Sequence, residues 1–520
     1  MKAVHCVVVA AVAAALAGCG AEELASAGSG GNITVNYPPA QTPVTPPTNP
    51  TANQVTPAGG CPTIADPAGL RDDGTLTGPT GTYRICSLPA RLPVNTTLSR
   101  LPGVLYALDG RVDVGNDLGP SGATGITLAI EAGVIIFGKT GTSWLAVNRG
   151  NRISAVGTAS RPVIFTSRDN VLGLVTDDSQ GQWGGVVLLG RAPITDCAAP
   201  GATPGTVNCE RQTEGAVDPA LFGGATPADN SGIMDFVQIR YSGYVLSANT
   251  ELQALTLEGV GSGTTIRHIH SHNSSDDGFE NFGGRVSMRY IVVTGADDDS
   301  VDVDTGYQAG IQYLIAVQKT SGNADSMIEL DSANALEDNT PRTNLKLANF
   351  TFVHRNPATP NTAAILMRGK ADASLVNGVV TSALACLRLN GTNILTADPA
   401  TQKLGPPVFS SVVMQCGGGA GPFVGTGGVT VQQVADVFNA GTNNSAAFAA
   451  TLTGGFINGA SETARIAADP KSIDATFDTT TYVGAVKDAS DTWYAGWTCN
   501  SATASFGNTA TACTSLPPLN

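Results

Sequence analysis

The sequence predicts an all-β protein built as a right-handed parallel β-helix, in which short strands coil around one long core. Three observations lead to this prediction. The 520 residues include 62 Gly and 30 Pro but only 13% charged residues, a balance that argues against a helical bundle. Short apolar segments separated by Gly, Asn or Asp follow one another from about residue 121, with no helical period between them. Finally, the sequence pattern of these predicted strands repeats along the chain.

The repeat is clearest where three apolar segments are each followed by an acidic turn. Asp276, Asp298 and Asp325 occupy matching positions, 22 and then 27 residues apart. A repeat of roughly 20–30 residues made only of short strands is typical of a parallel β-helix. Leucine-rich repeats share this period, but their Leu-rich consensus is missing. Three apolar residues are expected to stack as a ladder inside the coils: Phe279, Val301 and Ile328.

The amino terminus is typical of an exported protein. Residues 1–18 combine Lys2 with a short apolar stretch, which predicts a signal peptide rather than a membrane-spanning helix. The following Leu-Ala-Gly-Cys resembles the lipobox of bacterial lipoproteins, and this implies cleavage before Cys19 and lipid on its sulfur. Because Gly20 is not Asp, we expect the outer membrane or the cell surface rather than retention at the inner membrane.

The remaining eight cysteines predict disulfide-stapled end caps. Eight cysteines allow 105 connectivities, and zinc is the competing reading, although no CxxC spacing is present. We expect each cysteine to pair with its neighbour in sequence: Cys61–Cys86, Cys197–Cys209, Cys386–Cys416 and Cys499–Cys513. Each bridge would contribute ~2–4 kcal/mol to stability.

Composition then divides the chain into segments. We expect two short helices in the last of them, at 429–438 and 445–452. The predicted segments are a signal peptide (1–18), a lipid-anchored Pro-rich tether (19–60), an N-terminal cap (61–120), the β-helix (121–430) with an insert (191–230), and a C-terminal cap (431–520).

The charge balance limits the partners. With 28 Lys and Arg against 42 Asp and Glu, the net charge is −14, so the chain is a poor candidate for nucleic acid. Calcium, cationic partners or polymers bridged through cations suit it better.

An acidic patch is the strongest local signal for a site. The alternation in Ser300–Asp304 points Val301 and Val303 inward and two Asp residues outward. Neighbouring carboxylates ~4.8 Å apart repel by ~0.9 kcal/mol in water and ~3.5 kcal/mol at an effective dielectric of 20, so a bound cation or a proton is expected. The stacking predicts an outward column of Glu280, Asp302 and Glu329, with Asp304 and Asp331 in the next column. The candidate calcium ligands are Asp276, Asp277, Glu280, Asp302, Asp304 and Glu329. A solvated acidic face is the alternative.

Histidines and two basic residues offer weaker candidate sites. His268, His270 and His272 alternate, so on a strand they would share one face and could hold a metal, against the simpler reading of an exposed His-rich strand. Arg368 and Lys370 could grip an anionic sugar, although a structural or solvated role explains them as well.

A family resemblance rests on three motifs, GQWGGVVLLG at 181–190, EGVGSGTTI at 258–266 and DDGFENFGG at 276–284. They are similar to those of a widespread group of bacterial secreted proteins and lipoproteins with a pectin-lyase-like β-helix. The likeness covers roughly residues 121–390 and the Trp497 region. It implies fold and location, and the group has no settled activity.

Function is therefore predicted in outline. We expect a lipoprotein whose β-helix binds an extracellular polymer, such as a polysaccharide, or an outer-membrane protein through a calcium-binding acidic face. The enzymes that share this fold attack polysaccharides, so a lyase or glycoside hydrolase using Asp298, Asp299 and Asp302 is the alternative. A passive scaffold or adhesin would need no site.

Overall fold

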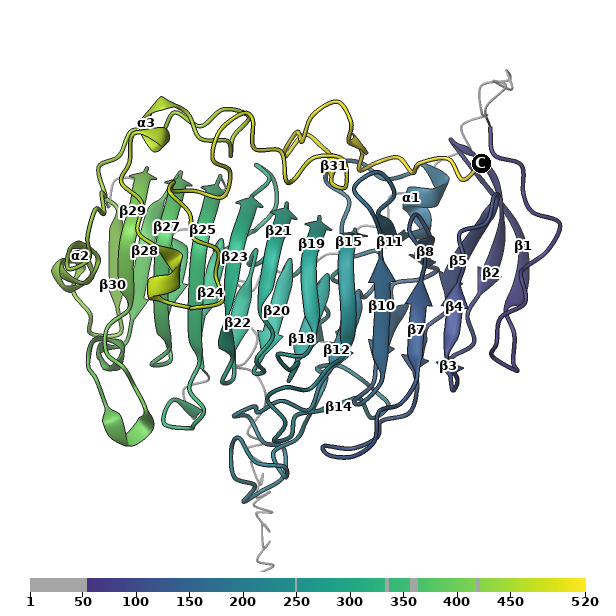
Figure 1. The fold of residues 1–520 in the computed structure, drawn as a ribbon, viewed down its shortest axis with the longest axis horizontal. Helices are drawn as coiled ribbons and strands as arrows, with labels where there is room; N and C mark the ends of the chain where they lie inside the picture. The colour runs from purple at the N-terminus through teal and green to yellow at the C-terminus, as the bar shows by residue number, and fades with distance from the viewer. Residues whose placement is uncertain (1–53, 248–249, 333–335, 356–362, 418–420) are drawn as a thin grey trace, which may run out of the picture.

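A computed structural model describes residues 54–247, 250–332, 336–355, 363–417 and 421–520. The predicted signal peptide, Cys19 and most of the tether lie outside these residues. The described chain winds into a parallel β-helix with one long core, as the sequence predicts (Figure 1). No helix in the described ranges is long and apolar enough to cross a membrane.

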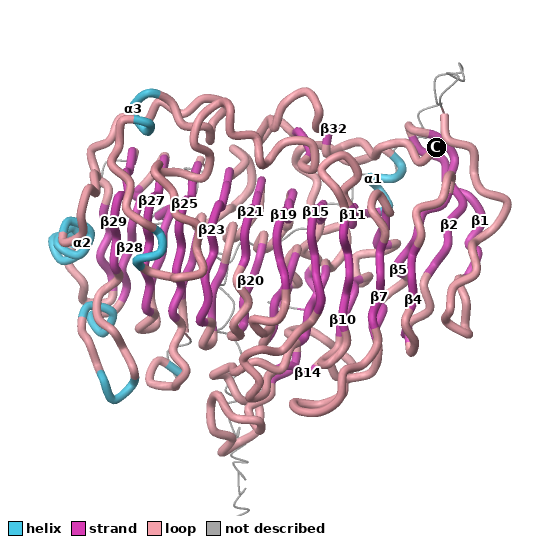
Figure 2. The backbone as a smooth tube through the Cα atoms, in the orientation of Figure 1, coloured by secondary structure: helices cyan, strands magenta, loops and turns pink. Residues whose placement is uncertain are grey.

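Two large sheets run the length of the molecule, and Figure 2 shows their strands side by side. The 15-stranded sheet consists of β1 (Arg71–Gly78), β2 (Gly81–Ser87), β4 (Thr96–Leu98), β5 (Val104–Leu108), β7 (Thr127–Ile130), β8 (Ile135–Gly138), β10 (Arg152–Val156), β11 (Val163–Ser167), β15 (Gly232–Arg240), β19 (Thr265–His272), β21 (Met288–Thr294), β23 (Gln308–Val317), β25 (Asn344–His354), β27 (Asp372–Ser382) and β29 (Val408–Cys416). The 11-stranded sheet consists of β3 (Arg91–Leu92), β6 (Arg111–Val114), β9 (Trp144–Val147), β12 (Val186–Leu189), β18 (Leu255–Glu258), β20 (Phe279–Phe282), β22 (Asp302–Asp304), β24 (Ile328–Leu330), β26 (Ala363–Met367), β28 (Ala385–Asn390) and β30 (Phe423–Thr426).

The smaller elements lie at the ends of the coil stack and in its loops. The two-stranded sheets are β13 (Arg211–Gln212) with β14 (Leu221–Phe222), β16 (Val245–Ser247) with β17 (Thr250–Glu251), and β31 (Cys499–Asn500) with β32 (Thr511–Ala512). The helices are α1 (Arg168–Leu172), α2 (Val431–Asn439) and α3 (Ala460–Thr463), with 3₁₀ turns η2 (Thr392–Leu395), η3 (Pro399–Thr401) and η4 (Pro470–Ser472).

The core follows from the alternation of the strands. Val301 and Val303 are fully buried and belong to the main apolar cluster together with Phe279 and Ile328, so the predicted ladder is confirmed. The close stacking of the coils also explains why residue 378 is a glycine. Gly378 in β27 faces Phe350 on the next coil, and a Cβ there would lie 2.1 Å from the ring.

The long strands of the larger sheet each bend at one residue with a positive φ. These residues occupy one register position from β15 to β29: Phe236, His268, Tyr290, Tyr313, Asn349, Asn377 and Ser411. Since a left-handed residue breaks the period-two alternation, side chains on its two sides change phase. The bend therefore gives the coil a corner within a single strand.

The ends differ from the prediction in detail. Parallel pairing already begins with β2 and β5, so the coil stack starts before residue 121, and β1 closes it by antiparallel pairing with β2. At the other end α2 forms close to the predicted helix at 429–438, whereas 445–452 is not helical. The amphipathic turn of α2 buries Val434 and Phe438 against the last coil.

The chain after α2 is more than an end cap. In Figure 1 the yellow carboxyl-terminal segment runs back along the strand ends towards the purple coils. Leu516 and Leu519 pack beside Tyr83 and Leu105 near the first coils. On the way, the guanidinium of the buried Arg240 donates to two backbone carbonyls of this segment. The segment thus ties both ends of the solenoid together.

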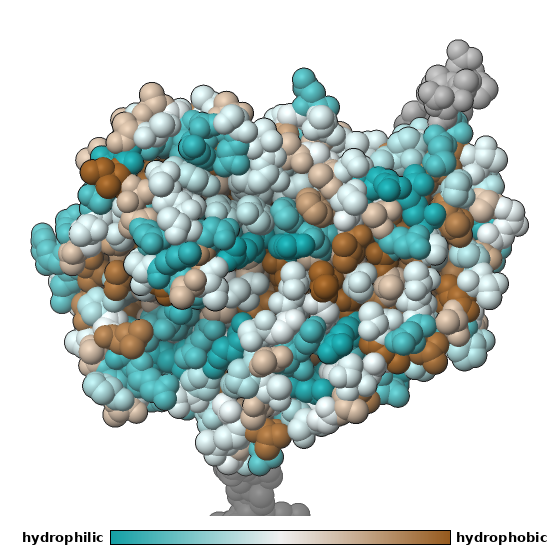
Figure 3. All heavy atoms as spheres, viewed as in Figure 1, coloured by the Kyte–Doolittle hydropathy of each residue, from teal (hydrophilic) through white to brown (hydrophobic). Residues whose placement is uncertain are grey.

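All four predicted disulfides are present: Cys61–Cys86, Cys197–Cys209, Cys386–Cys416 and Cys499–Cys513. Cys197–Cys209 lies in the predicted insert, which forms an excursion carrying β13 and β14. The face of the molecule seen in Figure 3 is largely hydrophilic, and its apolar side chains lie in small groups.

Candidate functional site

Acidic turns precede three consecutive strands, β20, β22 and β24. Two of their carboxylates act as a ladder between coils. Oδ1 of Asp277 accepts the backbone N–H of Asp299 at 2.9 Å, and Oδ1 of Asp299 accepts that of Ser326 at 2.6 Å. The repeat therefore brings the matching carboxyl groups of successive turns together, as the sequence indicates.

The predicted outward column is also in register. Glu280 pairs with Asp302, and Asp302 pairs with Glu329, on adjacent parallel strands. Asp302 is only 2% exposed and Glu329 is fully buried, so the alternative of a solvated acidic face is wrong for these two residues. Asp276, in contrast, is half-buried and connects the column with the surface.

Two groups of these carboxyls have the geometry of a cation site. Asp276, Asp277 and Asp298 form one, and Asp277, Glu280 and Asp302 form the other; within each group, one oxygen from every residue lies within 4.8 Å of the others. We call these five residues the acidic cluster. Oε1 of Glu280 and Oδ1 of both Asp298 and Asp302 are buried without a hydrogen-bond partner. A donor set made only of carboxylate oxygens suits a hard cation such as calcium.

The same crowding changes the acidity of the cluster. Burial raises the pKa of Asp276 to about 7, with the charge of Glu251 adding to the effect. Burial and then Asp276 raise the pKa of Asp298 well above its usual value, and burial and then Glu329 do the same for Asp302. Without a cation, the cluster therefore retains protons at neutral pH, and a bound cation would release them.

Arg368 closes one end of the column. Its guanidinium pairs with Glu329 at 2.6 Å and with Asp331 at 2.7 Å. Lys370, the other predicted sugar-binding residue, instead pairs with Asp338 and lies 3.7 Å from Asp398. The structure thus places Arg368 at the acidic column and does not bring Lys370 to it.

Asp299 and Asp304 each use one carboxylate oxygen in a backbone hydrogen bond and leave the other oxygen without a partner. Asp299, a candidate catalytic residue, uses one oxygen in the backbone ladder, while its Oδ2 is buried without a partner. Asp304, a candidate ligand, accepts the N–H of Thr305 at 2.5 Å, and its Oδ2 is likewise without a partner. Asp304 lies beside Phe282 and belongs to neither carboxyl group described above.

The three histidines do not converge on the acidic cluster. His268 is the bent residue of β19 and stacks between Phe236 and Tyr290 at 4.2 and 4.6 Å between ring centroids. His270 and His272 both meet the hydroxyl of Thr294 at 2.9 Å. Neither carboxyl group among the described residues includes a histidine, because the histidines lie on β19 of the larger sheet and the carboxyls lie on or before β20 and β22 of the smaller sheet. His268 and His270 do share an outer face, where they contact Trp497 and Phe506 of the carboxyl-terminal segment.

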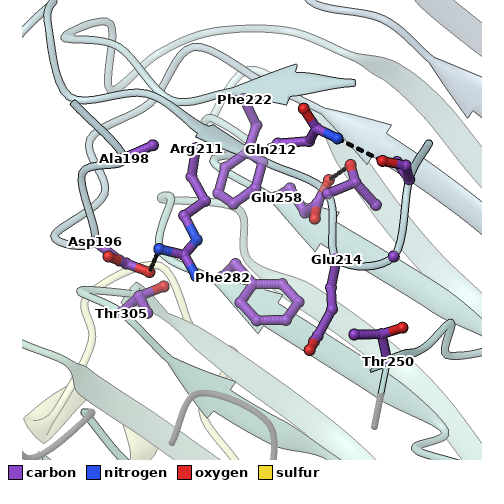
Figure 4. Close-up of a pocket in the computed structure, with 13 residues that line it drawn as sticks. Asp196, Ala198, Arg211, Gln212, Glu214, Phe222, Thr250, Glu258, Phe282 and Thr305 are labelled. Carbon is purple, nitrogen blue, oxygen red and sulfur yellow. Dashed lines mark hydrogen bonds and ion pairs between the residues drawn. The ribbon is translucent and has the colours of Figure 1, made fainter. Parts of the chain in front are cut away.

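The excursion covers a cavity of about 310 Å³ (Figure 4). Its residue Glu214 lies close enough to Asp276 of the acidic cluster for their charges to interact. Phe222 and Phe282 line the cavity with ring centroids 6.2 Å apart, and Glu214, Glu258 and Arg211 add polar groups. Register links the cavity to the acidic residues, since Phe282 pairs with Glu258 on one side and with Asp304 on the other. The repeat alone could have placed Phe282 in this ladder. Glu214 carries no such signal, because the excursion does not follow the repeat.

Comparison with known proteins identifies the fold family. The family model described as a pectate-lyase like beta helix domain matches residues 103–498 of the chain. No curated protein matches the chain, and no solved structure does.

Proposed function

Because the chain belongs to the family of pectate-lyase-like β-helix domains, which fits a polysaccharide-related function in broad terms, we propose that it binds an extracellular polysaccharide through calcium. The observation that carries the proposal is the acidic cluster, whose buried oxygens lie close together and partly lack hydrogen-bond partners. Such oxygens are costly unless a proton or a cation reaches them.

The residues of the acidic cluster fit calcium. They would supply carboxylate oxygens from two turns and two strands, and the half-buried Asp276 offers the route from solvent. Bound calcium would supply the positive charge that draws an anionic polymer to an otherwise acidic chain. An acidic outer-membrane partner is the alternative ligand for the same charge.

Calcium titration of the full chain by calorimetry, followed by polymer binding with calcium or chelator, tests the proposal. We expect binding of an acidic polysaccharide that chelator abolishes. Replacing Asp302 and Asp304 together by Asn should remove both calcium and polymer binding, whereas Asp218→Asn, at an exposed position of the excursion, should leave both unchanged. Polymer binding that persists in chelator would contradict the proposal, and a chain that binds neither calcium nor polymer would be a scaffold.

A second candidate function, a polysaccharide lyase or glycoside hydrolase, is favoured by the acidity of the turns. Burial raises the pKa of Asp325 to about 6 and that of Asp276 to about 7, which suits proton transfer near neutral pH. Asp298, Asp299 and Asp302 would be the reacting carboxyls. New reducing ends or unsaturated sugars that disappear in Asp299→Asn would establish the enzyme. Asn retains the Oδ1 that accepts the Ser326 N–H, so folding should persist.

We also propose that lipid on Cys19 holds the protein at the outer membrane or the cell surface, supported by the Leu-Ala-Gly-Cys sequence. Cys19→Ser should move the protein from the membrane fraction to the soluble fraction. A Cys19→Ser protein that stays in the membrane fraction would contradict a lipid anchor.

A further inference from the structure

The cavity beneath the excursion differs in chemistry from the acidic cluster beside it. Its walls combine the two phenylalanine rings with hydroxyl, carboxyl and guanidinium groups, as Figure 4 shows. Phe222 and Phe282 lie on different segments, one in the excursion and one in the coil stack. A cavity of about 310 Å³ lies at the small end of ligand sites, and suits a single ring better than an extended segment.

The excursion that forms the roof is fixed in place. The Cys197–Cys209 disulfide closes it, and Arg211 pairs with Asp196 at 2.6 Å. Glu210 pairs with the buried Arg149 of the coil stack. Covalent and ionic contacts therefore hold the roof of the cavity, so little ordering is required when a ligand binds.

Burial favours the protonated forms of two acid groups of the cavity, Glu214 and Glu258. Burial raises the pKa of Glu214 to about 8, with Asp276 and Glu251 adding to it and Arg211 opposing. Burial also raises the pKa of Glu258 to about 8. Thr213, whose hydroxyl donates to Glu258 at 2.5 Å, opposes this rise, as do Arg211 and Arg111, while Glu214 adds to it.

Two features select against an anionic occupant. Arg211 is already paired with Asp196, so its charge is largely neutralised. Among the described residues that line the cavity, Arg211 is the one cation, so an anion would meet no unpaired positive charge there, and any ionised Glu214 would repel it. The rings offer an apolar surface, while protonated carboxyls and hydroxyls offer hydrogen bonds, and this combination matches the two faces of an uncharged sugar ring.

We infer that the cavity beneath the excursion binds an uncharged sugar unit of the polymer, next to an acidic unit held through calcium at the acidic cluster. The inference rests on the proposed function. It narrows the ligand class to acidic heteropolysaccharides in which neutral sugars neighbour uronates, and it excludes a polymer of uronates alone as the preferred ligand.

The test compares two anionic polymers on the full chain in calcium. Deacylated gellan oligosaccharides, which join glucuronate to neutral sugars, should bind at least about tenfold more tightly than oligogalacturonates of similar length. Phe282→Ala should weaken gellan binding about tenfold and leave oligogalacturonate binding unchanged. Val217→Ala is the matched control, because Val217 lies in the same excursion, is 98% exposed and does not line the cavity.

A pH series with Glu214→Gln keeps the test decisive if Phe282→Ala fails to fold. A sugar that displaces water from an ionised Glu214 adds to its desolvation, so gellan affinity should fall as the pH rises above about 8. The Gln variant should keep the affinity at pH 7 and lose much of this fall. Equal or tighter binding of oligogalacturonate, or a pH dependence unchanged by Glu214→Gln, would overturn the inference.

Calcium titration of the same variants separates this outcome from failure of the proposed function. Normal calcium binding with no preference between the two polymers refutes the neutral-sugar site alone. Absence of calcium binding in the unmodified chain refutes the proposed function and this inference with it.

Discussion

Asp302→Asn should stabilise the calcium-free protein and destabilise the calcium-loaded protein relative to the unmodified chain. Asp302 lies between Glu280 and Glu329 in the parallel register. At a strand spacing of ~4.8 Å, each ionised neighbour repels it by ~0.9 kcal/mol in water and ~3.5 kcal/mol at an effective dielectric of 20. Arg368 offsets part of the contribution from Glu329. Because protonation also limits the cost, the expected gain in chelator at pH 8 is about 1–3 kcal/mol.

Thermal unfolding in chelator and in calcium measures both effects. For a chain of this length the gain corresponds to a rise in Tm of about 1–3 °C. In calcium the order should reverse, because a ligand at about one hundred times its Kd stabilises the folded state by ~2.7 kcal/mol and the variant lacks one ligand. Asp218→Asn should follow the unmodified chain in both conditions.

Two results would refute this reasoning. A variant that is less stable in chelator would mean that the carboxylate of Asp302 makes a net favourable contact. Equal stabilisation of both chains by calcium would place the cation elsewhere. Either result would show that repulsion by Glu280 and Glu329 does not determine the effect of Asp302 on stability.

Three further predictions concern charge and covalent structure. In chelator, the free energy of unfolding should fall as the pH rises from about 4 to 8. The pKa in the folded state is raised to about 7 for Asp276 and Asp331 and to about 6 for Asp325, so the stability that these groups contribute below their unfolded pKa is lost as the pH passes their folded pKa. A Tm that does not change with pH would contradict this prediction. Arg368→Gln should destabilise the protein in chelator by about 1–3 kcal/mol, measured by denaturant titration, because the fully buried Glu329 loses this partner. Arg289→Gln, which breaks a more exposed ion pair, should cost at most ~1 kcal/mol. Removing both Cys499 and Cys513 as Ser should cost ~3 kcal/mol by the same titration, as expected for a loop of 14 residues, and no loss would show that the carboxyl-terminal segment is held by packing alone.

The coil architecture was predictable because every coil repeats the same pattern. The ladder of Phe279, Val301 and Ile328 and the column of Glu280 and Asp302 follow once the repeat is aligned, since a parallel register stacks equivalent positions. The chain outside the repeat was harder to predict. Nothing in the local sequence indicates that Leu519 returns to the first coils, because that contact depends on the length of the whole stack.

The candidate site was predictable in its residues and not in its environment. Alternation correctly points Asp302 away from the core, but alternation cannot tell whether an outward residue meets water or other protein. The same holds for the histidines. Alternation places them on one outer face of β19, but it cannot tell that the carboxyl-terminal segment covers this face, with Trp497 against His268 and Phe506 against His270.

The coil stack also determines how an extended ligand would lie. Along the smaller sheet, the cavity at Phe282 in β20, the acidic cluster at Asp302 in β22 and the guanidinium of Arg368 just after β26 follow one another in that order. The span from β20 to β26 is three strand steps, or ~14 Å. A polymer running parallel to the solenoid axis would therefore meet the neutral position, then the cation-binding position and then the ion-paired guanidinium of Arg368, whereas one running along the strands would meet only one of them. Since the three chemistries differ, an axial polymer with matching units would be bound in one direction only.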